Sequence, residues 1–237
     1  MSASRKRLAI MQPYFMPYIG YFQLMAAVDE FVVFDDVNYI NRGWINRNRL
    51  LLNGVAHTFT VPLSGASQNK LICEIELVPG QAWREKLLRK VRQAYCKAPF
   101  YEQVFVLLTA VINYPTNRLD AFLLNSLRTI ANYMAIQTEI VASSRVYSNA
   151  TLKGQARILD ICRQEKADSY INPIGGTALY DRAEFVRQGV TLQFLQSRHI
   201  GYPQGNNTFV PCLSILDVLM FTGSSQVRQM LLEMDLI

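Results

Sequence analysis

One pattern constrains the fold of this chain most: apolar runs of strand length alternate with segments of helical apolar spacing. A run at 8–11 ends at Gln12-Pro13, residues 19–28 carry the helical spacing, and a run at 31–34 ends at Asp35-Asp36. This predicts a βαβ unit, which is parallel and right-handed. Ligands of open α/β sheets bind outside the carboxyl ends of the strands, so we expect both polar strand ends on one rim.

The same alternation returns in the second half of the chain. Strands are expected at 139–142, 169–172 and 191–195, with helices at 153–166 and 182–188 between them, and two helices at 214–221 and 226–234 follow. A second βαβ series of this kind predicts an α/β fold with a Rossmann-like, open and mostly parallel sheet.

The middle of the chain interrupts this alternation. Asn53-Gly54 divides two strand-like runs and predicts a type I′ hairpin, and 71–78 is a further strand candidate. Three helices are expected at 83–97, 100–113 and 117–135, separated by Pro99 and Pro115. We therefore expect a single α/β domain over 1–237, with a hairpin and strand insertion at 46–80 and a helical cap at 81–136.

Composition restricts the partners. The chain has 24 Lys and Arg against 18 Asp and Glu, a net charge of +6, which favours an anionic partner. Six cations lie at 84–97 without the interleaved aromatic residues of a base-stacking platform, so we expect a solvated helix face and no specific nucleic-acid binding. We also expect no signal peptide or membrane span, no metal site from the four scattered cysteines, and a cytoplasmic protein with reduced thiols.

The segment that follows the first strand is the first candidate binding element. It places two prolines, several aromatic rings and a glycine between a strand and its helix, where backbone N–H groups also face outward. Tyr18-Ile19-Gly20-Tyr21 stands where nucleotidyltransferases carry His-x-Gly-His, so a nucleotide-shaped pocket without charged phosphate ligands is expected. The alternative is that these rings wedge the loop into the core. The candidate residues are Gln12, Pro13, Tyr14, Tyr18, Gly20 and Tyr21.

The stretch from Asp35 to Arg49 is the second candidate. Two acids end a strand, and the next thirteen residues include three arginines and four asparagines. Arginines bind phosphates or carboxylates, and an aspartate beside them can accept a proton from an amine. The alternative is an Asp–Arg network that pins the hairpin. The candidates are Asp35 and Asp36 as proton acceptors, with Asn38, Arg42, Trp44, Asn46, Arg47, Asn48 and Arg49 as binding residues.

Two later loops complete the candidate site. Asn172 ends a strand, Gly175-Gly176 allows close backbone approach to an anion, and Tyr180 follows. Tyr202 and Gln204 lie in a polar loop after the last parallel strand. His199, in the same loop, titrates near neutral pH and is a third candidate base.

In these motifs the chain resembles the WbqC-like family, which is encoded in bacterial O-antigen and other polysaccharide clusters. The resemblance runs nearly end to end. It rests on Gln12-Pro13-Tyr14-Phe15 with 17–21, on Asp35-Asp36-Val37 with 44–48, and on 213–217, and Met16 is its one departure. It implies the tailoring of an activated sugar.

We therefore expect a transferase that moves an acyl or aminoacyl group to the amine of a nucleotide-linked amino sugar. The aromatic loop and the Gly-Gly turn would hold a nucleotide or activated acyl donor, the three arginines the anion, and Asp35, Asp36 or His199 would deprotonate the amine. The first loop, the Asp35-Asp36 end and the 172–176 turn should converge on one pocket. Two alternatives remain: an adenylate-forming or nucleotidyl-transfer enzyme, and a non-catalytic binding or scaffold protein of a glycan assembly system.

Overall fold

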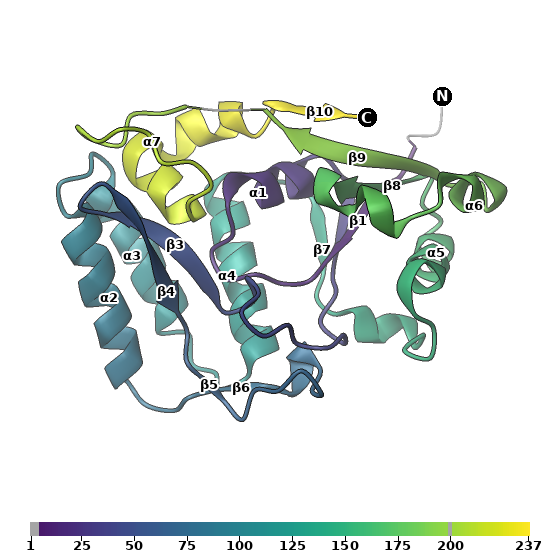
Figure 1. The fold of residues 1–237 in the computed structure, drawn as a ribbon, viewed down its shortest axis with the longest axis horizontal. Coiled ribbons are helices and arrows are strands. Elements are labelled where there is room, and N and C mark those ends of the chain that lie inside the picture. The colour runs from purple at the N-terminus through teal and green to yellow at the C-terminus, as the bar shows by residue number, and fades with distance from the viewer. Residues whose placement is uncertain (1–4, 199–200) are drawn as a thin grey trace.

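A six-stranded sheet forms the centre of the computed structural model, which describes residues 5–198 and 201–237 (Figure 1). β1 (Arg7–Met11) lies inside the sheet, flanked by β2 (Glu30–Val33) and β7 (Glu139–Val141) on one side. On its other side lie β8 (Ser169–Pro173), β9 (Thr191–Ser197) and the antiparallel edge strand β10 (Met234–Leu236). The fold is therefore mixed α/β with a mostly parallel sheet, as the alternation predicted.

The predicted βαβ series are both present. α1 (Ile19–Ala26) connects β1 to β2, which pair in parallel with Leu8 opposite Glu30. In the second series, α5 (Gly154–Gln164) precedes β8 and α6 (Arg182–Arg187) precedes β9. Local apolar spacing was sufficient to predict these helices, because α5 and α6 bury one face against the sheet and α1 is buried on nearly all sides.

Alternate side chains of β1 enter two separate apolar clusters, so both faces of the sheet are covered. Ala9 belongs to the larger cluster, together with side chains of α1. Leu8 and Ile10 belong to a smaller cluster that includes Ile158 of α5 and Phe185 of α6. This alternation follows from the two-residue period of a strand.

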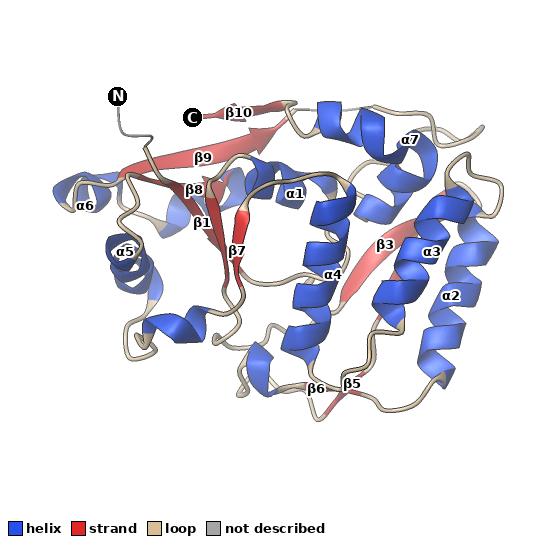
Figure 2. Ribbon diagram, turned by 180° about the vertical axis from the view of Figure 1, so that it is seen from behind, coloured by secondary structure: helices blue, strands red, loops and turns tan. Residues whose placement is uncertain are grey.

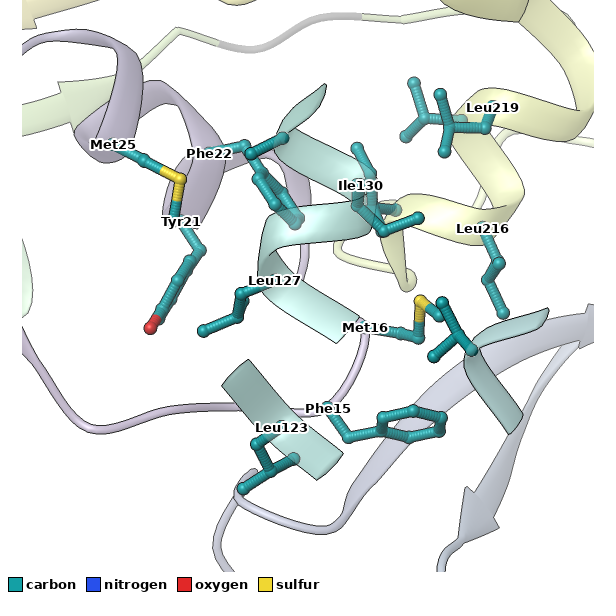
Figure 3. Close-up of a cluster of buried hydrophobic side chains, with 14 of the residues drawn as sticks. Phe15, Met16, Tyr21, Phe22, Met25, Leu123, Leu127, Ile130, Leu216 and Leu219 are labelled. Atoms are coloured by element: carbon teal, nitrogen blue, oxygen red, sulfur yellow. The ribbon is translucent and has the colours of Figure 1, made fainter. Parts of the chain in front are cut away.

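The three predicted central helices are α2 (Ala82–Tyr95), α3 (Tyr101–Ile112) and α4 (Leu119–Tyr133), which lie side by side (Figure 2). α4 is the nearest of them to the sheet. Its residues Leu123, Leu127 and Ile130 pack among the loop after β1, α1 and α7 (Ile215–Met230) (Figure 3). The helices thus share the larger apolar cluster with the sheet.

The predicted hairpin is confirmed. β3 (Arg47–Leu52) and β4 (Val55–Thr60) pair antiparallel, and Asn53 and Gly54 between them both have positive φ values, 53° and 76°. The strand expected at 71–78 is wrong over its first half, where a 3-10 helix, η1 (Ile72–Glu74), forms before the short β6 (Glu76–Leu77) pairs with β5 (Leu63–Ser64). The Glu74 side chain accepts a hydrogen bond from the N–H of Leu71 and closes this turn.

The carboxyl-terminal segment differs in its last part. Gly223, with φ 67° and ψ 178°, kinks α7 and separates the two expected helices. The second was expected to reach Met234, but it ends at Met230 and Met234 begins β10 opposite Ser197. The backbone N–H groups of Phe194 and Ile237 each donate to the backbone oxygen of the other residue and hold this segment beside β9. Periodicity within a short stretch of sequence does not predict such long-range pairing. Among the described helices, none is long and apolar enough to cross a membrane.

Candidate functional site

The carboxyl ends of the parallel strands bring several predicted motifs to one edge of the sheet. Gln12 follows β1, Asp35 and Asp36 follow β2, and the 3-10 helix η3 (Ile174–Leu179) follows β8. β1 and β8 are neighbours in the sheet. The helix that follows β1, α1, covers one face of the sheet, and the helix that precedes β8, α5, covers the other. Such a change of face marks the usual ligand crevice of an open α/β sheet.

Asp35 is buried at this edge and is held by the segment after β7. Its Oδ1 accepts hydrogen bonds from the Ser143 hydroxyl at 2.7 Å and the Ser144 N–H at 3.2 Å. The Arg145 guanidinium lies 3.3 Å from its Oδ2. Burial raises the pKa of Asp35, and the Ser143 hydrogen bond opposes that rise.

Asp36 forms a buried ion pair. Its Oδ2 lies 2.5 Å from Nη2 of Arg157, a residue of α5, and its Oδ1 accepts a hydrogen bond from the Ser144 hydroxyl. Arg157 also donates to the backbone oxygen of Asp36 and to Oδ1 of Asn149, and it stacks on Phe34 with its Cζ 4.7 Å from the ring centroid. The carboxylate of Asp36 is therefore fixed in one orientation.

A cavity of about 590 Å³ adjoins this ion pair. Its walls come from the segment after β2, the loop that leads into α5 with the first turn of that helix, and the end of η3. The lining residues are Phe34, Asp36, Val37, Asn38, Leu71, Ala150, Leu152, Lys153, Gly154, Gln155, Arg157, Ile158, Leu179 and Tyr180. Three predicted site residues, Asp36, Asn38 and Tyr180, are thus brought together.

The aromatic loop packs mainly into the core. Phe15, Met16 and Tyr21 are almost fully buried (Figure 3), and the Tyr21 hydroxyl donates to the backbone oxygen of Gln12. Pro13 is buried, whereas Gln12 and Tyr14 are half-buried. Only Tyr18 is exposed within the predicted set of this loop, and its ring covers Gly20 so closely that a Cβ there would overlap it. None of these residues lines the cavity beside Asp36.

Asn46 and Asn48 hold backbone segments together. The Asn48 amide donates to the backbone oxygen of Met16 at 2.8 Å, and the Ser214 hydroxyl donates to the same oxygen at 2.7 Å. Asn46 accepts from the Tyr39 hydroxyl and donates to the backbone oxygen of Val61. The motifs at 12–21, 44–48 and 213–217 therefore meet at one buried junction.

The three predicted anion-binding arginines lie away from this cavity, where Arg42 is exposed and Arg47 and Arg49 are half-buried. Arg47 donates to the backbone oxygens of Gly43 and Arg42, and Arg49 donates to that of Cys212. The guanidinium groups of Arg47 and Arg49 lie 5.6 Å from the ring centroid of Trp44, which is 43% exposed. Arg47 thus braces the turn at 42–43, Arg49 joins the hairpin to the segment before α7, and none of the three predicted arginines lines the cavity beside Asp36.

The two later loops, at 172–180 and 202–204, make contacts with different partners. Asn172 donates to the Tyr170 hydroxyl, which lies 3.2 Å from that of Tyr180, and the Asn172 side chain fills the space beside Gly176, whereas Gly175 is open. Tyr202 and Gln204 instead donate to the buried carboxylate of Asp217. His199 lies outside the described residues.

The sequence analysis missed Arg157 and Lys153, which line the cavity, and Ser144, which supports Asp36. A signal for Arg157 exists, because it stands four residues before Ile161 on the apolar stripe of the expected helix, at a core position. Ser144 directly follows the expected strand at 139–142. Within the described part of the chain, no group of three or more His, Cys, Asp or Glu side chains is placed to hold a metal ion.

The chain is similar to a protein family and to a mycobacterial protein. The model of the WbqC-like protein family matches residues 12–229. An uncharacterized protein of Mycobacterium tuberculosis is 29% identical over 222 residues, which cover 92% of this chain and 95% of the relative. No solved structure matches the chain.

Proposed function

The chain belongs to the WbqC-like protein family, and on that premise we propose that it is a transferase acting at the cavity beside Asp36. The reaction proposed is the transfer of an acyl or aminoacyl group to the amine of a nucleotide-linked amino sugar. We further propose that it acts in the cytoplasm, in bacterial polysaccharide biosynthesis of the O-antigen type.

The observation that carries this proposal is the cavity itself. Its volume of about 590 Å³ falls within the range of roughly 300–1,000 Å³ typical of small-molecule sites. It combines apolar walls, such as Leu152 and Leu179, with a carboxylate and a phenol. It also lies at the carboxyl end of β2, where open parallel sheets bind their ligands.

The first turn of α5 suits a phosphate group. The helix begins at Gly154 in the cavity wall, and its N-cap, Lys153, makes no side-chain capping hydrogen bond within the described residues. Free N–H groups and the positive end of the helix dipole attract an anion there. The exposed ammonium of Lys153 adds a full charge, so we place the phosphates of the nucleotide at this wall.

Asp36 is the proposed acceptor of the amine proton. The amine nitrogen attacks the carbonyl carbon of an activated acyl donor, a C–N bond forms, and the bond from that carbon to the leaving group breaks. The amine releases one proton, which passes to the Asp36 carboxylate that Arg157 and Ser144 orient. Burial raises the pKa of Tyr180, so its hydroxyl stays protonated and can donate a hydrogen bond to the leaving group.

The test uses the full-length protein with a nucleotide-linked amino sugar and an acyl-coenzyme A, and mass spectrometry detects the N-acylated sugar. We expect Asp36→Asn to lower kcat by roughly 10²-fold or more with little change in KM, because it removes the proton acceptor and keeps the shape. Asp29→Asn is the matched control, since Asp29 pairs with Arg7 at the opposite edge of the sheet.

Two results would replace this proposal. Release of pyrophosphate from ATP and Mg²⁺ with an organic acid would show an adenylate-forming enzyme, or a nucleotidyltransferase if a sugar phosphate is required. Tight binding of a nucleotide sugar without turnover, by a protein confirmed as folded, would show a binding or scaffold protein.

We propose a single Rossmann-like α/β domain as the organisation behind this function, with an insertion at 46–80 and a helical cap at 81–136. The larger apolar cluster supports it, because it joins Phe31 of the sheet with Phe59 of the hairpin and Leu127 of α4. The strand order around β1 supports the Rossmann-like description.

A further inference from the structure

A second cavity, of about 370 Å³, lies at the beginning of α2. Its walls are Gly80, Gln81 and Arg84 on one side and the α3–α4 connection at 113–117 on the other. α2 lies across the molecule from α5 (Figures 1 and 2), the helix whose first turn lines the cavity beside Asp36. The two cavities share no lining residue.

Arg84 in this wall is buried and poorly satisfied. Only 7% of its surface is exposed, although the sequence analysis placed it on a solvated helix face. Its Nη1 is buried and has no hydrogen-bond partner among the described residues. Its Nη2 makes a long hydrogen bond of 3.4 Å to the backbone oxygen of Thr116.

The positive charge of Arg84 also lacks a counter-charge. Burial lowers its pKa, and no carboxylate of the described chain opposes that effect. The face of Trp83, 4.5 Å from the Arg84 Cζ, compensates the charge only in part. An uncompensated buried cation is unfavourable, and an oxyanion bound beside Arg84 would relieve that cost.

The amino end of α2 supplies further donors. Its N-cap, Gln81, makes no side-chain capping hydrogen bond within the described residues, so the N–H groups of the first turn have no such partner. Gly80, with φ 95°, has no atom within 4 Å of the position a Cβ would take, which leaves the approach open. The helix dipole adds partial positive charge at the same place.

We propose that this cavity binds an oxyanion, the phosphate or carboxylate group of a small molecule, between Arg84 and the first turn of α2. The buried guanidinium supplies the charge, the positive end of the α2 dipole adds to it, and the 113–117 connection forms the far wall. The site is independent of the transferase proposal, because it uses none of the residues around Asp36.

The test titrates the full-length protein with inorganic phosphate and, separately, with acetate, at an ionic strength held constant with chloride. Backbone amide NMR shifts report binding, and we expect saturable changes at Ala82, Trp83 and Arg84. Arg84→Gln should weaken binding at least about tenfold. Arg89→Gln, which removes an exposed cation from the same helix, should change affinity less than about twofold.

The two anions distinguish a phosphate site from a carboxylate site, and saturation by either supports the proposal. Absence of saturable shifts for both anions in the parent protein overturns it, and this result needs no variant to fold. Equal binding by the parent and Arg84→Gln also overturns it. A structural role for Arg84 predicts a lower unfolding midpoint of Arg84→Gln in chloride alone, whereas we expect no decrease.

Discussion

At the scale of single residues, the ion pair between Asp36 and Arg157 gives a direct prediction. Both side chains are buried, so removing either charge leaves the other uncompensated. We expect Asp36→Asn and Arg157→Gln each to lower the free energy of unfolding by about 3 kcal/mol, and the double variant to lose clearly less than the sum. Urea denaturation of the parent, the two single variants and the double variant measures these free energies. Strict additivity would mean that the two groups do not interact.

Asp217 gives a pH-dependent prediction. Burial raises the pKa of this carboxyl above its ordinary value of 3.8, opposed by hydrogen bonds from Tyr202, Tyr95 and Gln204. The folded state therefore keeps a proton that the unfolded state has released. The unfolding free energy of the parent, relative to Asp217→Asn, should decrease as pH rises from about 3.8 through the raised pKa, and stay constant above it.

Urea denaturation at fixed pH values between about 3 and 7 tests this relation, with the difference between the two proteins as the measured quantity. Tyr95 and Tyr202 do not titrate in this range, because burial raises the pKa of each. A difference that increases with pH would show that the pKa of Asp217 is lowered on folding.

The predicted residues show what single positions in a sequence can reveal about a site. The position of Asp36 was predicted correctly because an acid directly after a buried parallel strand must lie at the carboxyl edge of the sheet, and its role there stays a proposal. Asn48 was taken for a ligand contact, yet its amide holds the backbone of Met16. The sequence shows that Asn48 carries a hydrogen-bond donor but not which group accepts the bond, because the acceptor lies in a distant segment.

At the scale of elements, the kink in α7 depends on Gly223. Its φ of 67° and ψ of 178° suit glycine, and a Cβ there would lie 2.6 to 2.9 Å from three ring carbons of Phe100. We expect Gly223→Ala to lower the free energy of unfolding by about 2–5 kcal/mol, from backbone strain and overpacking together.

Gly189→Ala is the matched control for this prediction, because Gly189 has a φ of 75° and open space around the Cβ position. It should cost only about 1–2 kcal/mol, the backbone contribution alone. Chemical denaturation of both variants makes the comparison. Equal losses would mean that Phe100 yields without cost.

The elements that were predicted correctly are those with a complete local signal. The helices α2 to α4 have apolar stripes and proline boundaries, and the hairpin has its Asn53-Gly54 turn. The errors fall where contacts with distant segments determine the structure. Residues 234–236 become a strand through pairing with β9, and the backbone N–H of Cys73 in η1 donates to the backbone oxygen of Asp35. No window of sequence contains both partners of such contacts.

At the scale of the whole molecule, we predict little nucleic-acid affinity despite the net charge of +6. Of the six cations at 84–97, Arg84 is buried, and Lys90 donates to the backbone oxygen of Thr58. We expect RNA and DNA to bind without sequence preference and with Kd values of about 10⁻⁶ M or weaker at physiological salt. Filter binding across a salt series checks this, and sub-micromolar RNA affinity would contradict it.

The position of β1 inside the sheet sets an order for folding. Its hydrogen-bond partners on the β2 side are near in sequence, since the residue numbers of Arg7 and Asp29 differ by 22, whereas those of Lys6 and Asp168 on the β8 side differ by 162. Closing the longer loop costs about 2 kcal/mol more in chain entropy. The β8–α6–β9 unit is equally local, since Ser169 pairs with Thr191 at a separation of 22. Both βαβ units are therefore expected to form before β1 pairs with β8, and substitutions that weaken only the β1–β8 contact should mainly accelerate unfolding.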